Sequence, residues 1–315
     1  MELTRAGSLR CLDVFSIALN QADSSGWYSS TLQLQLASLQ FCVMCRSVST
    51  LHMALKDGMH TLLLENAPAS DTQVKKLRRT RVPTIQPLIL TWELPGSCLK
   101  LFSSEALVKV EQLTFGDRFN DKVNDVVWPS SLRRLTFGHD FNQAVDRVIW
   151  PASLQQLTFG KYFNQAIDGI AWPASLRQLT FGEYFNQADD GVVWPASLQH
   201  LTGVSFDQAI DGVVWPTSLQ QLEFGQLFDQ AIAGVVWPAS LQVLTFGALF
   251  NQPLDGVMWP ASLQQITFGL CFDQPIDGVS WPASLQHLKF GYCFRQPISG
   301  VVWPATLQQI TFDRD

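Results

Sequence analysis

Carboxylates recur at a near-constant spacing of 22 residues through the C-terminal two-thirds of the sequence. They are Asp146, Asp168, Asp190, Asp211, Asp255 and Asp277. In a regular stack of repeats these side chains would form a column about 5 Å apart, and such a column could bind calcium. Ala233 interrupts the column, however, and the Gly-Gly-x-Gly-x-Asp repeat of calcium-binding β-rolls is absent. Asp before Gly is an ordinary turn former, so we expect turns here and no metal site.

Cysteines and histidines could also support chemistry, but their spacing is wrong for it. Cys42 and Cys45 form a C-x-x-C pair, yet no second pair follows, and His52 and His60 stand at no zinc-finger spacing. We expect both cysteines in a helical core. The sequence contains no Gly-rich phosphate loop and no G-x-S-x-G, and no histidine has a nucleophile partner in the repeat pattern. We therefore expect neither enzymatic activity nor a cofactor.

Charge and hydropathy narrow the class of partner. From residue 108 onward the chain has eleven Lys/Arg against nineteen Asp/Glu, so a nucleic-acid partner is not expected. The N-terminus is a poor signal peptide, no apolar run approaches the roughly 20 residues of a membrane span, and the six cysteines form no disulfide framework. We expect a cytoplasmic protein without a membrane partner. The basic run 75–81 is either a nuclear import signal or phosphate-binding patch, or a solvated loop.

Most of the residues from 108 onward belong to a repeated sequence, and the fold of that repeat decides where their side chains lie. Tryptophan precedes proline nine times with a period of 22 and one step of 21. Each copy carries a Leu-x-x-Leu-x-apolar core, as in Leu154-Gln-Gln-Leu157-Thr-Phe159, which is typical of leucine-rich-repeat-like solenoids. In a strand, Leu157 and Phe159 point inward and Thr158 points outward, because side chains alternate. Stacked repeats would therefore form a parallel concave sheet with a row of threonines on its outer surface.

The remaining residues of each repeat return the chain to the next strand. Gly160 lets the chain turn away from the strand, and Asp168-Gly169 supplies a second turn. Trp172-Pro173 predicts a rigid convex segment with no room for a long helix, with the Trp side chain in the core. The Asn-Gln pair at Asn164-Gln165 recurs in most copies, and repeated amides can satisfy the backbone groups of neighbouring copies. We interpret this pair as structural.

The motif Phe163-Asn164-Gln165-Ala166-Ile167 and its copies resemble the FNIP repeat, which is related to leucine-rich repeats. The resemblance covers about Val110 to Phe312, in nine copies and part of a tenth. Trp stands where the family has Leu before Pro, Ala replaces Pro in several early copies, and Arg295 stands where Asn or Asp is expected. The resemblance implies a non-enzymatic solenoid that binds a protein partner. In some family members the repeats follow an F-box, which docks onto a cullin-type ubiquitin ligase.

The N-terminal region is interpreted in two ways. Residues 36–51 are distantly similar to the second half of an F-box, whereas the first half of the box is poorly matched. Residues 1–90 are therefore either a divergent F-box-like region, which would bind the cullin adaptor through residues 1–60, or a helical cap of the first repeat. We expect residues 91–315 to form the repeats. The expected fold class is α/β: a leucine-rich-repeat-like solenoid with a parallel concave sheet of 22-residue repeats, little convex helix and a mainly helical N-terminal cap.

Binding specificity is expected where the copies differ. The two residues after the strand glycine vary most, passing from charged to apolar along the chain, and histidines interrupt the uniform strand positions. The candidate partner-binding residues are His139, Tyr162, Tyr184, His200, Leu227, Leu249, His287 and Tyr292. Variation at these sites is either functional or drift on an unselected surface. The predicted function is a protein-interaction scaffold, and the alternative is an F-box-type substrate receptor of a cullin ubiquitin ligase.

Overall fold

The structure is a computed structural model in which residues 111–187, 191–204 and 208–313 are described, together with the backbone of four strands upstream. The upstream strands are β1 (Leu34–Leu36), β2 (Leu39–Cys45), β3 (Leu62–Leu64) and β4 (Ile89–Trp92). No helix occurs among the described residues. Little helix was expected on the convex side, and this part of the chain has none, because the Trp-Pro segments and the turns leave no stretch long enough for a helix.

One short strand per repeat builds a single sheet. Its repeat strands are β5 (Gln112–Phe115), β6 (Arg134–Thr136), β7 (Gln156–Thr158), β8 (Gln178–Thr180), β9 (His200–Val204), β10 (Gln221–Phe224), β11 (Val243–Thr245), β12 (Gln265–Thr267), β13 (His287–Phe290) and β14 (Gln309–Phe312). The strands lie in chain order and pair in parallel from β2 to β14, while β1 pairs antiparallel with β2. The predicted parallel solenoid of 22-residue repeats is confirmed.

The register places equivalent residues of successive repeats side by side. Leu157 pairs with Leu179, and Thr158 pairs with Thr180. In β7 and β8 the leucine is buried and its two neighbours are half-buried. The predicted alternation is therefore confirmed, and it follows from the two-residue period of a strand.

Stacked aromatic rings fill the core behind the sheet. Phe159 stacks on Phe181 with ring centroids 5.6 Å apart, and Phe163 stacks on Phe185 at 6.0 Å. On the convex side Trp150 stacks on Trp172 at 6.4 Å. Each repeat thus buries its apolar face against the coils before and after it.

Polar ladders join the coils outside the sheet. The side-chain Oδ1 of Asn142 accepts hydrogen bonds from the backbone N–H of Asn164 and from Nε2 of Gln165, both at 2.9 Å. The Ser175 hydroxyl donates to the carbonyl of Leu154 at 2.6 Å. The structural interpretation of the Asn-Gln pair is confirmed, because each pair satisfies backbone and amide groups of the next copy.

Close packing between coils explains the strand glycines. A Cβ atom on Gly160 would overlap the carbonyl of Gly138, and the same contact recurs in most other copies. Gly160 does not have a positive φ, in contrast to Gly169 at 69°. The expected turn after Gly160 is present, since the N–H of Phe163 donates to the carbonyl of Gly160 at 3.2 Å. Glycine is required there by the approach of one backbone to the next, and not by a positive φ.

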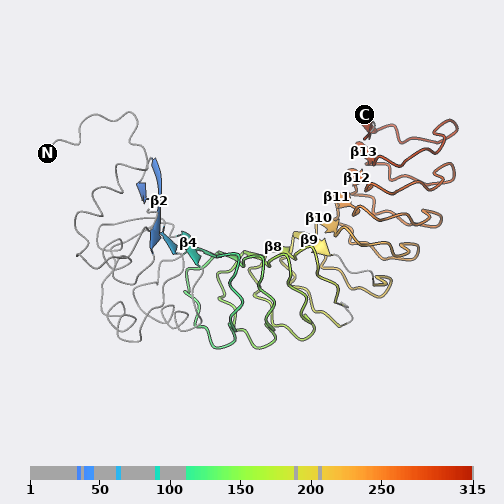
Figure 1. Cartoon of the computed structure of the whole chain (residues 1–315). Coiled ribbons are helices and arrows are strands. Elements are labelled where there is room, and N and C mark those ends of the chain that lie inside the picture. Colours follow the sequence, from blue (N-terminus) through green and yellow to red (C-terminus); the bar gives the residue numbers. More distant parts are fainter. Residues whose placement is uncertain are drawn as a thin grey trace, which may run out of the picture.

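The repeats form a curved arc in which the strands lie on the inner side and the connecting loops on the outer side (Figure 1). The arc changes direction near β9 and β10 (Figure 1), where the repeat is one residue short. Here Phe224 pairs with Val204 across a register shift, and Gly203 has a φ of 78°. The short copy therefore changes the local geometry of the sheet.

The upstream strands change one expectation about the N-terminal region. Strand β2 occupies Leu39–Cys45, inside the F-box-like segment 36–51 and over the two cysteines expected in a helical core, and it pairs with β3. The helical expectation is wrong for these seven residues, because a short apolar run has no periodicity that separates a strand from a helix. Cys42 and Cys45 thus belong to a strand. Strands β1, β3 and the start of β4 also lie within residues 1–90 and are extended, not helical. The rest of the expected helical cap, the rest of the F-box-like segment and the run 75–81 fall outside the described residues.

Candidate protein-binding surface

The concave face of the sheet carries mainly uncharged polar side chains. Its outer positions are occupied by glutamine at the start of most strands and by threonine two residues later. The exceptions among strands β5–β14 are Arg134, His200, Glu223, Val243, His287 and Lys289. Such a face offers many hydrogen-bond donors and acceptors and few fixed charges.

The two concave histidines stand far apart. His200 begins β9, where its Nδ1 lies 2.7 Å from Oε1 of Gln221, and His287 begins β13. Four strand spacings separate them, which is about 19 Å. They can contact one partner only if that partner extends along the sheet.

The rim of the sheet is formed by the two residues after each strand glycine, and its backbone is regular. The N–H of Tyr162 donates to the carbonyl of His139 at 3.0 Å, and the N–H of Tyr184 donates to the carbonyl of Lys161 at 3.1 Å. The same bond recurs in later coils, from Leu249 to Gln226 at 3.0 Å. The backbone therefore holds differing side chains in equivalent positions.

In the N-terminal half of the rim, the rings of Tyr162 and Tyr184 lie beside the salt bridge between Lys161 and Glu183. Tyr162 and Tyr184 are about half exposed. Lys161 Nζ lies 2.8 Å from Glu183 Oε2 and 5.5 Å from the ring centroid of Tyr184. The hydrogen bond and charge of Glu183 raise the pKa of Lys161, so the ammonium form is favoured. His139 lies beside Asp117, with Nδ1 3.8 Å from Oδ1.

In the C-terminal half the rim is apolar. Leu227, Leu249, Leu270 and Tyr292 have exposed fractions of 44%, 45%, 51% and 49%. Tyr292 also lies under the guanidinium of Arg295, with 5.5 Å between the carbon Cζ and the ring centroid. The rim candidates thus fall into two groups, His139, Tyr162 and Tyr184 before the short repeat and Leu227, Leu249 and Tyr292 after it. The structure does not bring His200 and His287 into either group, because both lie on the concave face.

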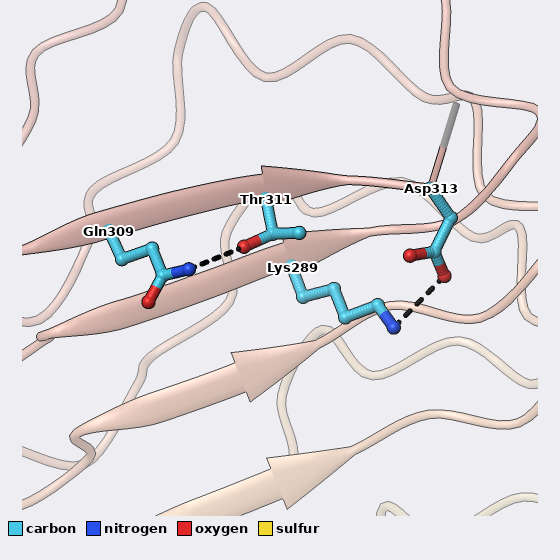
Figure 2. A network of polar contacts seen from close by, with 4 residues as sticks. All are labelled: Lys289, Gln309, Thr311 and Asp313. Carbon is cyan, nitrogen blue, oxygen red and sulfur yellow. Dashed lines mark hydrogen bonds and ion pairs between the residues drawn. The ribbon is translucent and has the colours of Figure 1, made fainter. Parts of the chain in front are cut away.

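The strand edge at β14 is held by its own polar contacts (Figure 2). Lys289 Nζ on β13 lies 3.0 Å from Asp313 Oδ2, and Gln309 Nε2 donates to Thr311 Oγ1 at 3.1 Å. Lys289 is therefore engaged within the chain, which leaves the concave face near β13 with little free charge.

The candidate metal column occupies exposed turns. The N–H of Val257 donates to the carbonyl of Leu254 at 3.2 Å, which closes a turn with Asp255 and Gly256 at its tip. Asp190 lies outside the described residues. No group of three or more Asp, Glu, His or Cys residues suited to a metal ion occurs in the described part of the chain. That part also has no helix of the length and hydropathy needed to cross a membrane.

Sequence reasoning missed a second exposed surface, a row of aliphatic side chains on the convex side. The residue before each tryptophan of a Trp-Pro step is highly exposed, and we call this row the aliphatic column. It consists of Val127, Ile149, Val193, Val214, Val236, Met258 and Val302, with exposed fractions from 63% to 84%. The alternation of an extended segment could have identified it, because a buried tryptophan requires its predecessor to face outward.

Comparisons with known proteins agree with this architecture. The family model described as FNIP Repeat matches residues 141–184, 228–271 and 272–315. The crystal structure of CroV588, a circular LRR protein, matches with 31% identity and a TM-score of 0.66 over 84% of this chain and 48% of that chain.

A more distant match shows the fold alone. A chain of the Toll–Spatzle complex of Drosophila matches with 12% identity and a TM-score of 0.61 over 86% of this chain and 39% of that chain. No curated protein matches the sequence. The chain spans less than half of each of the two structures. Residues 141–184 and 228–315 are thus FNIP repeats, and they form part of a leucine-rich-repeat-like solenoid.

Proposed function

We propose that the protein is a non-enzymatic scaffold that binds an extended protein partner along the concave face and rim of the solenoid. A solenoid offers a long surface on which equivalent positions of successive repeats can each contact a partner. The polar concave face would supply hydrogen bonds, and the exposed rim would supply the apolar contacts that dominate binding energy.

One observation carries this proposal: the rim side chains differ from coil to coil while their backbone does not. Tyr162, Tyr184 and Leu249 are 45% to 47% exposed at equivalent positions of the backbone ladder. Leu227, the second residue after its own strand glycine, is 44% exposed. Aromatic and large apolar side chains held on a rigid backbone lose little conformational entropy on binding. They are therefore the residues that would contribute most to affinity.

Proximity-labelling mass spectrometry in the native cell, followed by capture with purified protein, tests this function. A partner enriched by the native chain should be captured less by Tyr162→Ala/Tyr184→Ala. The matched control is Ile298→Ser, which alters an exposed apolar side chain outside both the rim and the aliphatic column. A partner that is captured equally by both variants would contradict binding at the rim. The expected cytoplasmic location rests on the sequence, and fractionation would test it.

The alternative function, an F-box-type substrate receptor, gains no support from the described residues. It requires a helical box within residues 1–60, and β2 is extended over Leu39–Cys45. Capture of the cullin adaptor by the full chain, and its loss on deletion of residues 1–60, would establish that function instead.

A further inference from the structure

The aliphatic column is an unusual surface for a solenoid coil. Its members, at 63% to 84%, are more exposed than the apolar rim residues, at 44% to 51%, and Val236 at 77% directly follows the buried Val235 at 3%. They are not incompletely buried core residues, since alternation directs them away from the tryptophans. Seven of nine equivalent positions are aliphatic, and only Ala171 and Ser280 depart from this pattern.

The column runs along the convex side with interruptions at Ala171 and Ser280. The tryptophan rings immediately after it stack at 6.2 Å for Trp128 and Trp150, and at 6.4 Å for Trp259 and Trp281. One aliphatic side chain is therefore presented about every 6 Å, close to the spacing of alternate residues in an extended segment. Contiguous exposed apolar surface of this kind is a mark of interaction sites.

Acidic turns run alongside the column. The turn residues lie two and three positions before the exposed aliphatic residue, so about 10 Å of chain at most separates them from it. They include six aspartates in the described part of the chain: Asp125, Asp146, Asp168, Asp211, Asp255 and Asp277. Arg147 is the single described cation in these two turn positions.

The charge of these turns is largely uncompensated. Asp146 lies near Arg147, with 3.6 Å between Oδ2 and Nε. Asp168, Asp211, Asp255 and Asp277 form none of the ion pairs found among the described residues. Subtracting the one arginine from the six aspartates leaves five negative charges beside an apolar row.

We propose that this convex band, defined as the aliphatic column together with its flanking aspartates, docks a basic amphipathic segment of a protein partner. Apolar side chains of the segment would cover the column, and its Lys or Arg side chains would face the aspartates. The aspartates would select against acidic segments and anionic lipid surfaces, because like charges oppose association. The band lies on the convex side, so this site is separate from the concave face and rim of the proposed function.

A synthetic 15-residue peptide of Leu and Lys in amphipathic order is a suitable probe. Fluorescence anisotropy with the full chain should show saturable binding that weakens several-fold when salt is raised from low to high concentration. A peptide with Glu in place of every Lys, and one with Ser in place of every Leu, should each bind at least tenfold more weakly. Equal binding of all three peptides would overturn the proposal.

Substitutions in three consecutive coils locate the site. The triple variant Val214→Ser/Val236→Ser/Met258→Ser should bind the Leu/Lys peptide at least tenfold more weakly than the native chain does. The matched control, Leu227→Ser/Leu249→Ser/Leu270→Ser, removes three exposed aliphatic side chains from the rim of adjacent coils and should change binding less than twofold. Loss of binding in the rim variant but not in the column variant would refute the convex site and leave the proposed rim function standing.

Two further measurements complete the test. Asp211→Asn/Asp255→Asn/Asp277→Asn should weaken the peptide about fivefold and flatten its salt dependence, and an unchanged salt dependence would count against the acidic flank. Melting temperatures of all variants should match that of the native chain, and if the column triple variant melts lower, the single Val236→Ser replaces it.

Neutral phosphatidylcholine vesicles test for a lipid surface. If they bind the native chain and this binding is lost in the column variant, the column docks a lipid surface, which would contradict a basic protein segment.

Discussion

The rings of Tyr162 and Tyr184 stack on the surface of the solenoid with centroids 5.2 Å apart and planes 5° from parallel. Both rings keep about half of their surface exposed. A stacked pair of this kind is a rigid apolar platform with two hydroxyl groups at its edge.

Replacing both tyrosines by alanine should weaken the cognate partner by about 2 kcal/mol or more, which is about 30-fold in Kd. The melting temperature should hardly change, because neither ring belongs to the core. Isothermal titration and thermal unfolding of the same preparations check this. Unchanged affinity, or affinity lost only with the fold, would show that these rings are not contact residues.

The strand glycines and the turn glycines should respond differently to alanine. Gly160→Ala forces a Cβ against the Gly138 carbonyl, and backbone atoms cannot rotate away, so we expect a loss of about 3 kcal/mol. Gly169→Ala meets no atom within 4 Å and has only the cost of its positive φ, about 1 kcal/mol. Urea unfolding of the two variants measures the difference. Equal losses would mean that the coils can move apart at no cost.

The hydrogen bonds between successive Asn-Gln pairs should stabilise the fold through the side-chain oxygen that accepts them, and not through the amide nitrogen of the same side chain. Asn142→Ala leaves the N–H of Asn164 and Nε2 of Gln165 without their shared acceptor and should cost about 1 to 3 kcal/mol. Asn142→Asp should cost much less, because Asp229 accepts the same bonds from Asn251 and Gln252. Chemical unfolding compares the two variants. An Asp variant as unstable as the Ala variant would contradict this role.

The junction between Leu198 and Leu222 should be the weakest among the interior repeats. The short copy lacks the strand phenylalanine, and the register shifts between β9 and β10. Amide hydrogen exchange should therefore be faster there than at β7 or β12. Uniform protection along the sheet would show that the remaining contacts compensate for the missing ring.

Cys271 and Cys293 should form a disulfide under mild oxidation. They occupy the same position in adjacent repeats and are free, half-buried thiols in the structure. Their Cα atoms should be about 5 Å apart, which is within disulfide range. Peptide mapping after diamide treatment should find the pair, and Cys271→Ser should abolish it. A native chain that yields neither this pair nor a mixed product would contradict the expected spacing.

Much of the solenoid was predictable because each repeat obeys a local rule. Leu157 is buried and Thr158 is half exposed, as strand alternation predicts, and the tryptophan at 150 lies in the core as the Trp-Pro step indicates. The rim candidates Tyr162 and Leu249 are exposed because they follow the strand outside the alternating core. Whether they contact a partner stays a prediction.

Strand β2 was not predictable, because an apolar run of seven residues fits a helix and a strand equally well. Its pairing with Leu62–Leu64 involves residues far along the chain, and no repeat marks the partner. The aliphatic column was overlooked for a different reason. In Val235-Val236 two identical residues have opposite environments, so residue type alone cannot tell them apart, and only the alternation before the buried tryptophan separates them.

The sequence by itself determined the period, the strand of each repeat and the side chains that enter the core, since these follow from residue type and from the two-residue alternation of a strand. Only the tertiary structure decided why Gly160 must lack a side chain, where the sheet shifts register, and that an apolar row lies beside acidic turns on the convex side. These features depend on how closely one coil approaches the next, and that distance is set by the packing of the whole stack and not by any single repeat.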